Sequence, residues 1–546
     1  MATTTNSGAT PPLLRLFKRK SVEQMHAEHA GGELKKSLGA LNLVLLGIGC
    51  IIGTGIFVLT GRAAANFAGP GIMISFVITG FLCAFVALAY SELAAAIPVS
   101  GSAYSYSYAS MGEFVAWIMG LLLLLEYGVA ASTVAVGWSG YTVSLLHDLG
   151  VNIPFALTIP PDATHIDPVT QAVLPGAIDP ATGEVVRGIV NLPALIGIIA
   201  VTSLLTVGVT ESATVNNIVV AIKVTVVVAF IVIGAAYVKP ELWSPLVPPR
   251  EPALPEGMSL WDQIVQALGQ VVTGQNNGKY GIGGLIAGAA TIFFAYIGFE
   301  AVSTAGAESK NPSRDMPIGI LGSLLICTVL YILTCAVLVG IVPYTELNDP
   351  APIAKAVNAI GLPWFAFLVK VGAFAGLSSV MLVLLYGQTR IFYTMSRDGL
   401  LPSIFASVNK KTQTPVVNTL LVGAIAAGFA GFKGLDFLGD ITNVGTLVAF
   451  GIICLTVIYL RFARPDLNRP FKMPGWLAIT VAALGGIMCF VLFMSLMANQ
   501  HMRQFFGIYL AMGILVYFAY GMWNSKLGRG IAVTGHEQPN PVQPNQ

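Results

Sequence analysis

The sequence predicts an all-α polytopic membrane protein with 12 transmembrane helices. Its 546 residues are 55% hydrophobic and only 10% charged, whereas soluble domains carry about 25% charged residues. The mean hydropathy is +0.77. Runs of about 20 apolar residues are long enough to cross a bilayer as a helix, and twelve such runs are present. These predicted spans lie near residues 40–62, 70–97, 114–146, 191–209, 213–238, 284–306, 317–342, 364–395, 416–431, 440–461, 475–497 and 505–523.

Basic residues orient the spans. With the N-terminus inside the cell, 18 lysines and arginines fall in cytoplasmic segments and 8 in outer ones, while Lys223 and Lys370 lie within spans. An excess of this kind marks the cytoplasmic side. We therefore expect a cytoplasmic N-terminal segment (1–38), with an interfacial helix or a solvated tail around residues 13–25, and a cytoplasmic, disordered tail (526–546). No cleavable signal is expected, because the first apolar run can span the membrane by itself.

Two outer connections are long. The loop at about 148–190 is rich in proline and acidic residues, and its segment 179–183 has the composition of a turn. The loop at 239–283 contains an amphipathic pattern near 259–272 that predicts a short helix. We assign neither loop a role in substrate binding.

Glycines interrupt the first span. Four of them fall within residues 47–57, and each lowers helix stability by about 1 kcal/mol relative to alanine. An opened backbone inside a bilayer is tolerated only where protein or a watery cavity covers it, so the pattern predicts a broken helix. The freed amides around Gly53, Thr54 and Gly55 would suit a carboxylate. A helix-packing motif from Gly49 to Gly53 is the alternative, but it needs no further glycine at position 55.

A second interruption lies in the sixth span, where Gly298 and Glu300 occur inside an apolar run. Interrupted segments at corresponding positions of two halves indicate an inverted-repeat transporter with a site at the membrane midplane. Because the interruptions fall in spans one and six, we expect five helices in a first repeat (39–238), five in a second repeat (284–461) and two extra helices (462–525).

Residues around the second interruption are candidate gate or covering groups. Phe294, Tyr296 and Phe299 could cover a substrate, although aromatic residues in membrane helices more often serve packing alone. Glu300 follows the break on its cytoplasmic side. It could form part of an inner gate, or it could stabilise the helix through a polar contact.

Glu126 is an acidic residue deep inside the third span. It lies 13 residues past Glu113, or about 20 Å at 1.5 Å per residue. A bare charge at this depth costs roughly 2.5–3.5 kcal/mol to insert. One interpretation is a protonated or hydrogen-bonded glutamate that stabilises helix packing. The other is a carboxylate that faces a cavity and attracts a substrate cation or a proton.

Lys223 is a basic residue deep inside the fifth span, 12 residues beyond Glu211. At about 18 Å from that end it is too deep to reach the interface comfortably. Burial without a partner disfavours the charged form of a lysine, so Lys223 could load and release a proton near neutral pH. It could equally be a static tether that donates hydrogen bonds to an unwound carbonyl.

Several classes of function lack their sequence motifs. The chain has no G-x-x-x-x-G-K-[ST] loop, so nucleotide-driven transport is not expected. It has no H-E-x-x-H and no convincing G-x-S-x-G, so no catalytic residues and no enzyme are expected. The six cysteines lie in apolar runs without a C-x-x-C pair, which favours neither metal sites nor disulfides. We expect no cofactor, and the net charge of +2 does not indicate a nucleic-acid partner.

A set of short motifs is distributed along the chain. The motifs are LGIGCIIGTGIF (46–57), YSEL (90–93), GSAYSYSY (101–108), GEF (112–114), LEY (125–127), ESATVNN (211–217), FEAV (299–302), ESKNP (308–312), QTRI (388–391) and MSRDGL (395–400). This set resembles the amino acid–polyamine–organocation permeases, and within them the cationic amino acid transporter family and its bacterial members. The resemblance runs from about residue 13 to past residue 460.

The resemblance implies a leucine-transporter-type 5+5 inverted repeat with two extra helices. In this family the backbone of the two broken helices holds the substrate, so amides near Gly53, Thr54 and Gly55 would bind the carboxylate. The amine would bind the carbonyls of Ile51, Phe294, Ala295 and Ile297. Glu126 matches a family glutamate near the substrate side chain. Lys223 matches the fifth-helix lysine of proton-coupled members.

The predicted function is secondary active uptake of amino acids, coupled to protons, across the plasma (inner) membrane. The expected substrates are cationic amino acids such as arginine and lysine; the alternatives are a broad or small neutral range (alanine, leucine) and exchange. A channel is less favoured because the chain has two broken helices and no ring of repeated polar residues. A non-transporting sensor is also less favoured. The expected partners are the amino acid, the proton and the lipid bilayer, and the sequence does not decide whether the chain has partner subunits.

Overall fold

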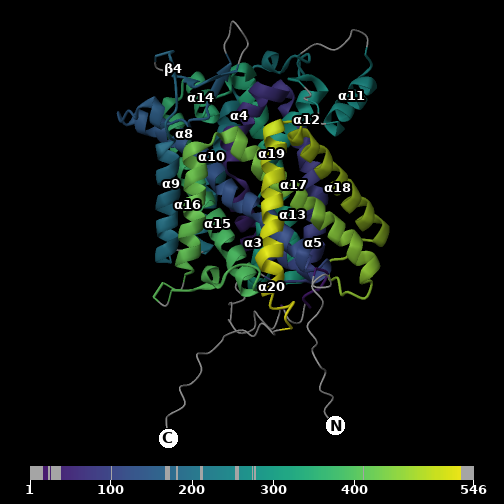
Figure 1. Ribbon diagram of the computed structural model, residues 1–546. Coiled ribbons are helices and arrows are strands. Elements are labelled where there is room, and N and C mark those ends of the chain that lie inside the picture. Colours follow the sequence, from purple (N-terminus) through teal and green to yellow (C-terminus); the bar gives the residue numbers. More distant parts are fainter. Residues whose placement is uncertain are drawn as a thin grey trace, which may run out of the picture.

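The computed structural model describes residues 16–21, 25, 38–99, 101–166, 173–179, 182–208, 213–251, 258–273, 275, 278–409, 411–412 and 414–530. In these ranges the chain forms a bundle of long helices, with two small hairpins at one end (Figure 1). The predicted fold class, an all-α polytopic membrane protein, is confirmed.

The longer helices coincide with the predicted spans. They are α3 (Ala40–Ile51), α5 (Ile72–Ala96), α7 (Glu113–Leu123), α8 (Ala130–Asp148), α9 (Leu192–Val207), α10 (Ala213–Ala235), α12 (Gly281–Ile292), α13 (Pro312–Ile341), α15 (Pro363–Arg397), α16 (Val416–Phe432), α17 (Leu435–Ala463), α18 (Gly475–Met497) and α19 (Gln500–Val516).

Shorter elements connect and interrupt these helices. The α-helical ones are α4 (Thr60–Ala63), α6 (Ser102–Ser110), α11 (Leu260–Val272), α14 (Pro352–Ala359) and α20 (Met522–Asn524). The π-helices are η1 (Gly55–Leu59), η2 (Ala64–Ala68), η4 (Leu124–Val129) and η11 (Tyr517–Gly521). The 3-10 helices are η3 (Gly69–Gly71), η5 (Phe155–Leu157), η6 (Pro240–Trp243), η7 (Phe293–Tyr296), η8 (Glu300–Glu308), η9 (Tyr344–Glu346) and η10 (Ser403–Ala406).

The helices are apolar enough to lie in a membrane. Among the described residues, 9 helical stretches have the length and hydropathy to cross one, and three shorter apolar helices complete the predicted set: Ala40–Ile51, Leu192–Val207 and Val416–Phe432. Several helices extend past their apolar runs, because helix formation continues through polar ends that hydropathy excludes. The tenth span, for example, was predicted to start at residue 440 and starts at Leu435.

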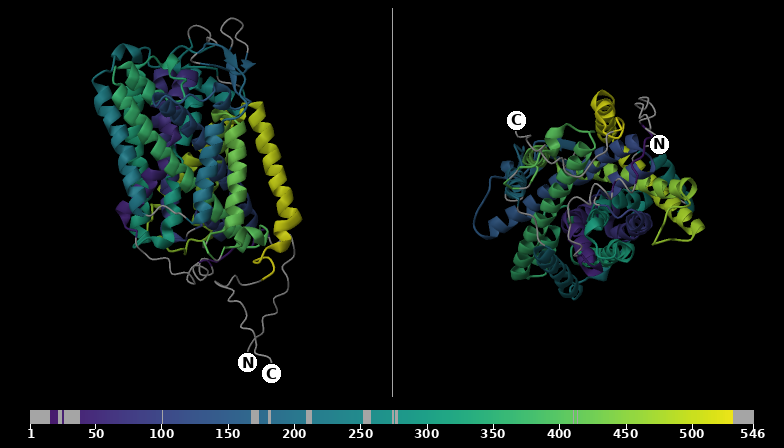
Figure 2. Two further views of the ribbon diagram at one scale, coloured as in Figure 1. Left: turned by 90° about the vertical axis from the view of Figure 1, so that its left-hand side faces the viewer. Right: turned by 90° about the horizontal axis from the view of Figure 1, so that it is seen from below.

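The helix that carries the first break lies inside the bundle. Helix α3 packs against α10 and α13, and α13 packs against α5. Around this centre, α15 packs on α8, α16 on α9, and α17 on α18. Helix α19 stands at the edge, as the view from below shows (Figure 2). Leu515 and Ile487 on the outer helices α19 and α18 are exposed, as expected for surfaces that face lipid.

The described parts of the two predicted outer loops form short helices and hairpins at one end of the bundle. The predicted amphipathic helix is confirmed as α11, whose first turn is capped by a bond from Asp262 N–H to Ser259 Oγ (3.2 Å). The hairpins are β1 (Thr164–Ile166) with β2 (Val173–Pro175) and β3 (Ala177–Ile178) with β4 (Val185–Val186), both antiparallel. The predicted turn is present as well, since Gly183 N–H donates to Asp179 O (2.8 Å).

The first described residues dock on the opposite end. Residues 16–21 form no helix; the remainder of the candidate interfacial helix, except Met25, lies outside the described residues. Phe114 N–H donates to Leu16 O (3.1 Å), and Lys18 Nζ donates to Leu527 O (2.5 Å). Lys20 forms a buried ion pair with Asp398 (2.7 Å). The N-terminal segment is thus bound to the start of α7, the end of α15 and the residues after α20.

A buried three-residue ion cluster joins α5 to α17 near the same end. Glu92 is 2% exposed and pairs with Arg461 and with Arg469, whose Nε lies 3.3 Å from Glu92 Oε1. Arg469 also donates to the carbonyl of Leu460 (2.9 Å). The carboxylate is therefore the shared counter-ion of two guanidinium groups.

We expect Glu92→Ala to destabilise the protein by about 3–5 kcal/mol, because it leaves two buried cations without their anion. The measurement is the melting temperature of the purified protein in detergent. The matched control is Asp466→Ala, which removes an exposed partner of Arg464 and should not change the melting temperature, since such surface pairs contribute little. Equal melting temperatures for the two variants would contradict the prediction.

Candidate functional site

The predicted break in the first span is present. Helix α3 ends at Ile51, and Ile52 adopts an extended conformation with ψ 97°. The last hydrogen bond of the first half runs from Ile52 N–H to Ile48 O (3.0 Å), and the second half begins with Phe57 N–H to Gly53 O (3.3 Å). The amides of Gly53 and Thr54 thus lie between the helical hydrogen bonds of the first half and those of the second. They are at the start of the second half-helix, where an anion is favoured.

The second break is present and packs directly on the first. Helix α12 passes into η7, the chain extends at Ile297 with ψ 132°, and Gly298 has φ +122°. A Cβ at position 55 would lie 2.2 Å from Ala295 Cα, and a Cβ at position 298 would lie 2.9 Å from the carbonyl carbon of Cys50. Both positions therefore require glycine, because the two interrupted backbones touch there.

The backbone groups predicted to bind substrate all lie in these two breaks. Ile51, Gly53, Thr54, Gly55, Phe294, Ala295 and Ile297 are buried. The carbonyl of Ile51 accepts a hydrogen bond from the Tyr331 hydroxyl (2.7 Å), and it keeps a second lone pair for another donor. The carbonyl of Phe294 accepts a bond from Ile297 N–H (3.3 Å). The structure thus brings the two halves of the predicted site together.

Lys223 reaches the first break from α10. Its Nζ donates to Gly49 O (2.7 Å) and Ile52 O (3.2 Å), the last carbonyls of the first half-helix, where the helix dipole favours a cation. The side chain is fully buried. Its stem passes beside Gly376 of α15, where a Cβ would lie 2.7 Å from Lys223 Cγ. This geometry fits a static tether and a proton-carrying amine equally well.

Glu126 reaches the site from the third span, on the π-helix η4 between α7 and α8. It is fully buried, and apart from the neighbouring Glu300 carboxyl neither of its carboxyl oxygens has a hydrogen-bond partner in the described chain. Glu300, also buried, is its electrostatic neighbour. Glu300 Oε2 accepts a bond from Gly298 N–H (2.8 Å). The structure therefore brings together two carboxyl groups that the sequence analysis considered separately.

The candidate gate residues form an aromatic layer around the second break. The Tyr296 hydroxyl donates to Phe76 O (2.8 Å). The ring of Phe299 meets Tyr90 edge-on at 6.0 Å and Phe450 at 5.2 Å between centroids. These contacts hold the backbone of the break in place. Whether the layer opens as a gate stays a prediction.

Three polar contributors to the site were missed from the sequence. Tyr331 bonds the first break, Asn443 Nδ2 donates to Ala290 O next to the second (2.8 Å), and Gln388 is buried with both terminal atoms unpartnered in the described chain. Each is a single polar residue in an apolar run. This signal marks a buried polar group but does not identify its partner.

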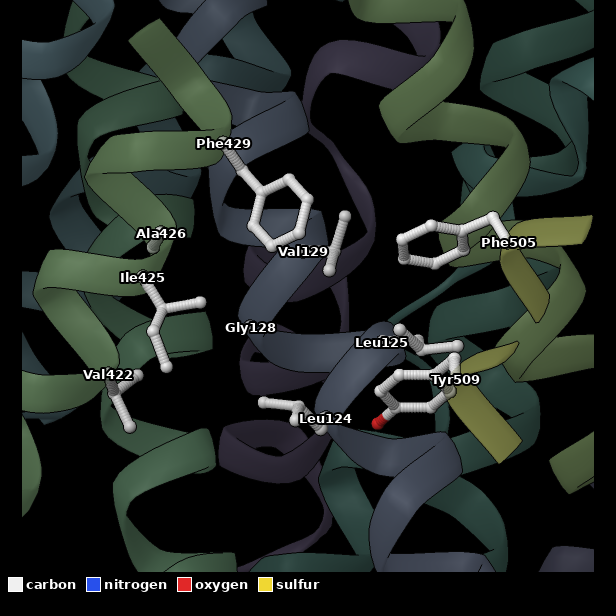
Figure 3. Close-up of a pocket in the computed structure, with 10 residues that line it drawn as sticks. All are labelled: Leu124, Leu125, Gly128, Val129, Val422, Ile425, Ala426, Phe429, Phe505 and Tyr509. Atoms are coloured by element: carbon white, nitrogen blue, oxygen red, sulfur yellow. The ribbon is translucent and has the colours of Figure 1, made fainter. Parts of the chain in front are cut away.

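A small apolar cavity lies on the other side of η4. Its volume is about 60 Å³, and it opens between η4, α16 and α19 (Figure 3). The lining residues are Leu124, Leu125, Gly128, Val129, Val422, Ile425, Ala426, Phe429, Phe505 and Tyr509. The Tyr509 hydroxyl donates a hydrogen bond to Leu121 O (2.7 Å). These walls carry no group that would recognise a zwitterion, so this cavity is not the candidate substrate site.

Two interrupted helices that meet around a buried polar site define a class of protein, the secondary transporters. A family model described as amino acid permease matches residues 38–518 of the chain. The chain belongs to the amino acid permease family. The sequence-based assignment to the amino acid–polyamine–organocation permeases is thereby confirmed.

Relatives cover nearly the whole chain. The methylthioribose transporter of Bacillus subtilis is 40% identical over 514 residues, which are 94% of this chain and 99% of that protein. The branched-chain amino acid permease BcaP of the same organism is 41% identical over 519 residues, with the same coverage. The vacuolar cationic amino acid transporter 4 of Arabidopsis thaliana is 36% identical over 454 residues, 83% of this chain and 68% of that protein.

Proposed function

We propose that this permease is a proton-coupled transporter that takes amino acids into the cell by alternating access. The observation that carries the proposal is the contact between the two breaks, with Lys223 bound to the carbonyls of one of them. Amides near Thr54 and Gly55 would hold the substrate carboxylate, and the carbonyls of Ile51, Phe294, Ala295 and Ile297 its amine. The proposed location is the plasma (inner) membrane with both termini in the cytoplasm, which the distribution of basic residues supports.

Lys223 would couple the proton to transport. Its ammonium supplies two hydrogen bonds that the interrupted helix cannot supply itself. Loss of its proton removes the positive charge and weakens both bonds, because a neutral amine is the poorer donor. The first half-helix would then be released from α10. A proton that arrives or leaves at Nζ would thereby change the conformation of the segment that binds the substrate.

Cationic amino acids are the first candidate substrates. Glu126 and Glu300 place two buried carboxyl groups beside the breaks, and a cationic side chain would neutralise negative charge there. Neutral branched-chain or small amino acids are the second candidate, supported by the 41% identity to a branched-chain permease.

Uptake into proteoliposomes under an imposed pH gradient tests the proposal. We expect labelled arginine, lysine, alanine or leucine to accumulate when the outside is acidic, with collapse of the gradient by a protonophore as control. Accumulation that does not depend on the pH gradient would overturn proton coupling. If no amino acid accumulates with or without the pH gradient, the proposal of amino acid transport is wrong.

Glu126→Gln should separate the two substrate classes. A hydrogen bond to a charged group contributes about 1.5–3 kcal/mol, so we expect about a 10- to 100-fold weaker apparent affinity for arginine and a much smaller change for alanine. Competition against a labelled substrate measures both. An equal loss for the two amino acids would return Glu126 to a role in helix packing.

A further inference from the structure

Glu126 and Glu300 belong to a larger group of buried side chains that have polar atoms without a hydrogen bond of good geometry in the described chain. The hydroxyl of Tyr90 has no hydrogen-bond partner in the described chain. The Tyr127 hydroxyl and Oε1 of Glu300 form no hydrogen bond of good geometry there, although Tyr127 lies within hydrogen-bonding reach of the Glu300 carboxyl. Both tyrosines are at most 2% exposed and are electrostatic neighbours of both carboxyls. Buried polar groups are almost always hydrogen-bonded, so polar atoms without a good hydrogen bond beside two carboxyls indicate a place where a polar ligand binds.

Among the described residues, the electrostatic neighbours of this pair include no cation. The titratable neighbours of the two carboxyls are the phenols of Tyr90 on α5 and Tyr127 on η4 and the thiol of Cys83 on α5, with Tyr106 beside Tyr90 and Cys50 beside Tyr127. All are neutral near pH 7. Lys223 is bound at the carbonyls of Gly49 and Ile52 instead. Two carboxylates in such a setting cannot both stay ionised.

We propose that Glu126 and Glu300 form one exchange site that holds a single positive charge. The charge is a proton when the substrate side chain is neutral and the ammonium or guanidinium group when the side chain is cationic. This inference rests on the proposed function and specifies how its binding site accepts two classes of side chain. The pair lies beside both breaks, since Glu300 follows Gly298 by two residues.

The two carboxyl groups have different roles. Glu300 accepts a backbone hydrogen bond from Gly298 (2.8 Å), which favours its ionised form. Glu126 accepts none, so it is the member that carries the proton, and Glu300 is a positioning residue that holds the proton there by its negative charge. When a cationic side chain enters, the O–H bond of Glu126 breaks, the carboxylate pairs with the cation and the proton leaves to water. Charge at the site is conserved.

Lysine and norleucine provide a matched pair of ligands, because they differ in the terminal ammonium group. Calorimetry of the purified transporter in buffers of different ionisation enthalpy gives the protons released per ligand bound. We expect lysine to release about one proton more than norleucine, and lysine affinity to rise by up to about tenfold per pH unit where Glu126 titrates. Any proton exchanged at Lys223 is common to both ligands and cancels in the difference.

Three variants test which of the two carboxyls carries the exchanged proton. Glu126→Gln should abolish the difference in proton release between lysine and norleucine. It should also lower the affinity for lysine at least tenfold, while norleucine still binds. Glu300→Gln should move the pH dependence of lysine binding to lower pH, because Glu126 loses the neighbouring negative charge, and Glu300→Asp should restore it. Glu113→Gln is the control: this buried glutamate at the start of α7 is bound by Tyr108, Tyr517 and Ser525, and both proton counts should stay unchanged.

Two results overturn the exchange site while the proposed function stands. One is equal proton release for lysine and norleucine. The other is binding of norleucine without binding of lysine. If neither these two ligands nor arginine, alanine or leucine binds, the proposed function fails and the exchange site fails with it.

Discussion

Lys223→Ala is expected to abolish accumulation driven by a pH gradient, so that the ratio of internal to external substrate falls to about one. The ammonium bonds Gly49 O and Ile52 O across the first break. Without it, no proton can be exchanged at that position, and the half-helix is no longer held to α10 in a proton-dependent way. Substrate binding, measured by calorimetry or by protection against thermal unfolding, should persist, because Lys223 does not supply the groups that bind the substrate backbone.

Two further variants make this result interpretable. Lys223→Arg keeps a cation and its donors but cannot release a proton in proteins, so it should bind substrate and still fail to accumulate it. Lys370→Ala is the matched control, because this second lysine within a span is paired with Asp148 (2.6 Å) near the start of α15. Accumulation by Lys223→Arg at the wild-type level would show that the lysine is a static tether.

Gly55→Ala is expected to abolish transport. The new Cβ would meet Ala295 Cα at 2.2 Å and Ala295 N at 2.8 Å. These are backbone atoms of the second break, which cannot rotate away as a flexible side chain could. The two interrupted helices must therefore separate, and the groups that bind carboxylate and amine move apart. Uptake of labelled substrate, normalised to the amount of folded protein in the membrane, measures the effect.

Gly451→Ala is the control for this substitution. Gly451 lies inside α17, and a Cβ there would meet no atom within 4 Å. Alanine is also the better helix former, so its uptake and stability should equal or exceed those of the wild type. Wild-type uptake by Gly55→Ala would contradict the proposed closeness of the breaks during transport.

The fold and the two breaks could be predicted because their causes are local. Apolar runs determine the spans through the thickness of the bilayer. The four glycines within residues 47–57 indicate the first break because glycine lowers helix stability. At the second break, the positive φ of Gly298 is a conformation that favours glycine. The Ser259 cap of α11 is local as well.

The partners of buried polar residues could not be predicted, because they are distant in sequence. Glu92 and Arg461 are 369 residues apart, and Tyr331 and Ile51 are 280 apart. Nothing near any of these residues specifies the pairing. The π-helix that presents Glu126 was also not expected, because hydropathy does not distinguish it from an α-helix. The substrate side chain stays undetermined for a related reason: the breaks recognise the backbone that all amino acids share.

The docking of the N-terminal segment has a consequence for biosynthesis. Residues 16–20 are synthesised before all the helices of the bundle, yet Lys18 binds the carbonyl of Leu527, which follows 509 residues later. At about 5–20 residues per second, the segment waits roughly 25–100 s for this partner. Ser525, which bonds Glu113 at the same end, is made equally late. This face therefore closes only after helices α3 to α20 have been synthesised, and a nascent chain that has inserted those helices still has residues 16–20 undocked.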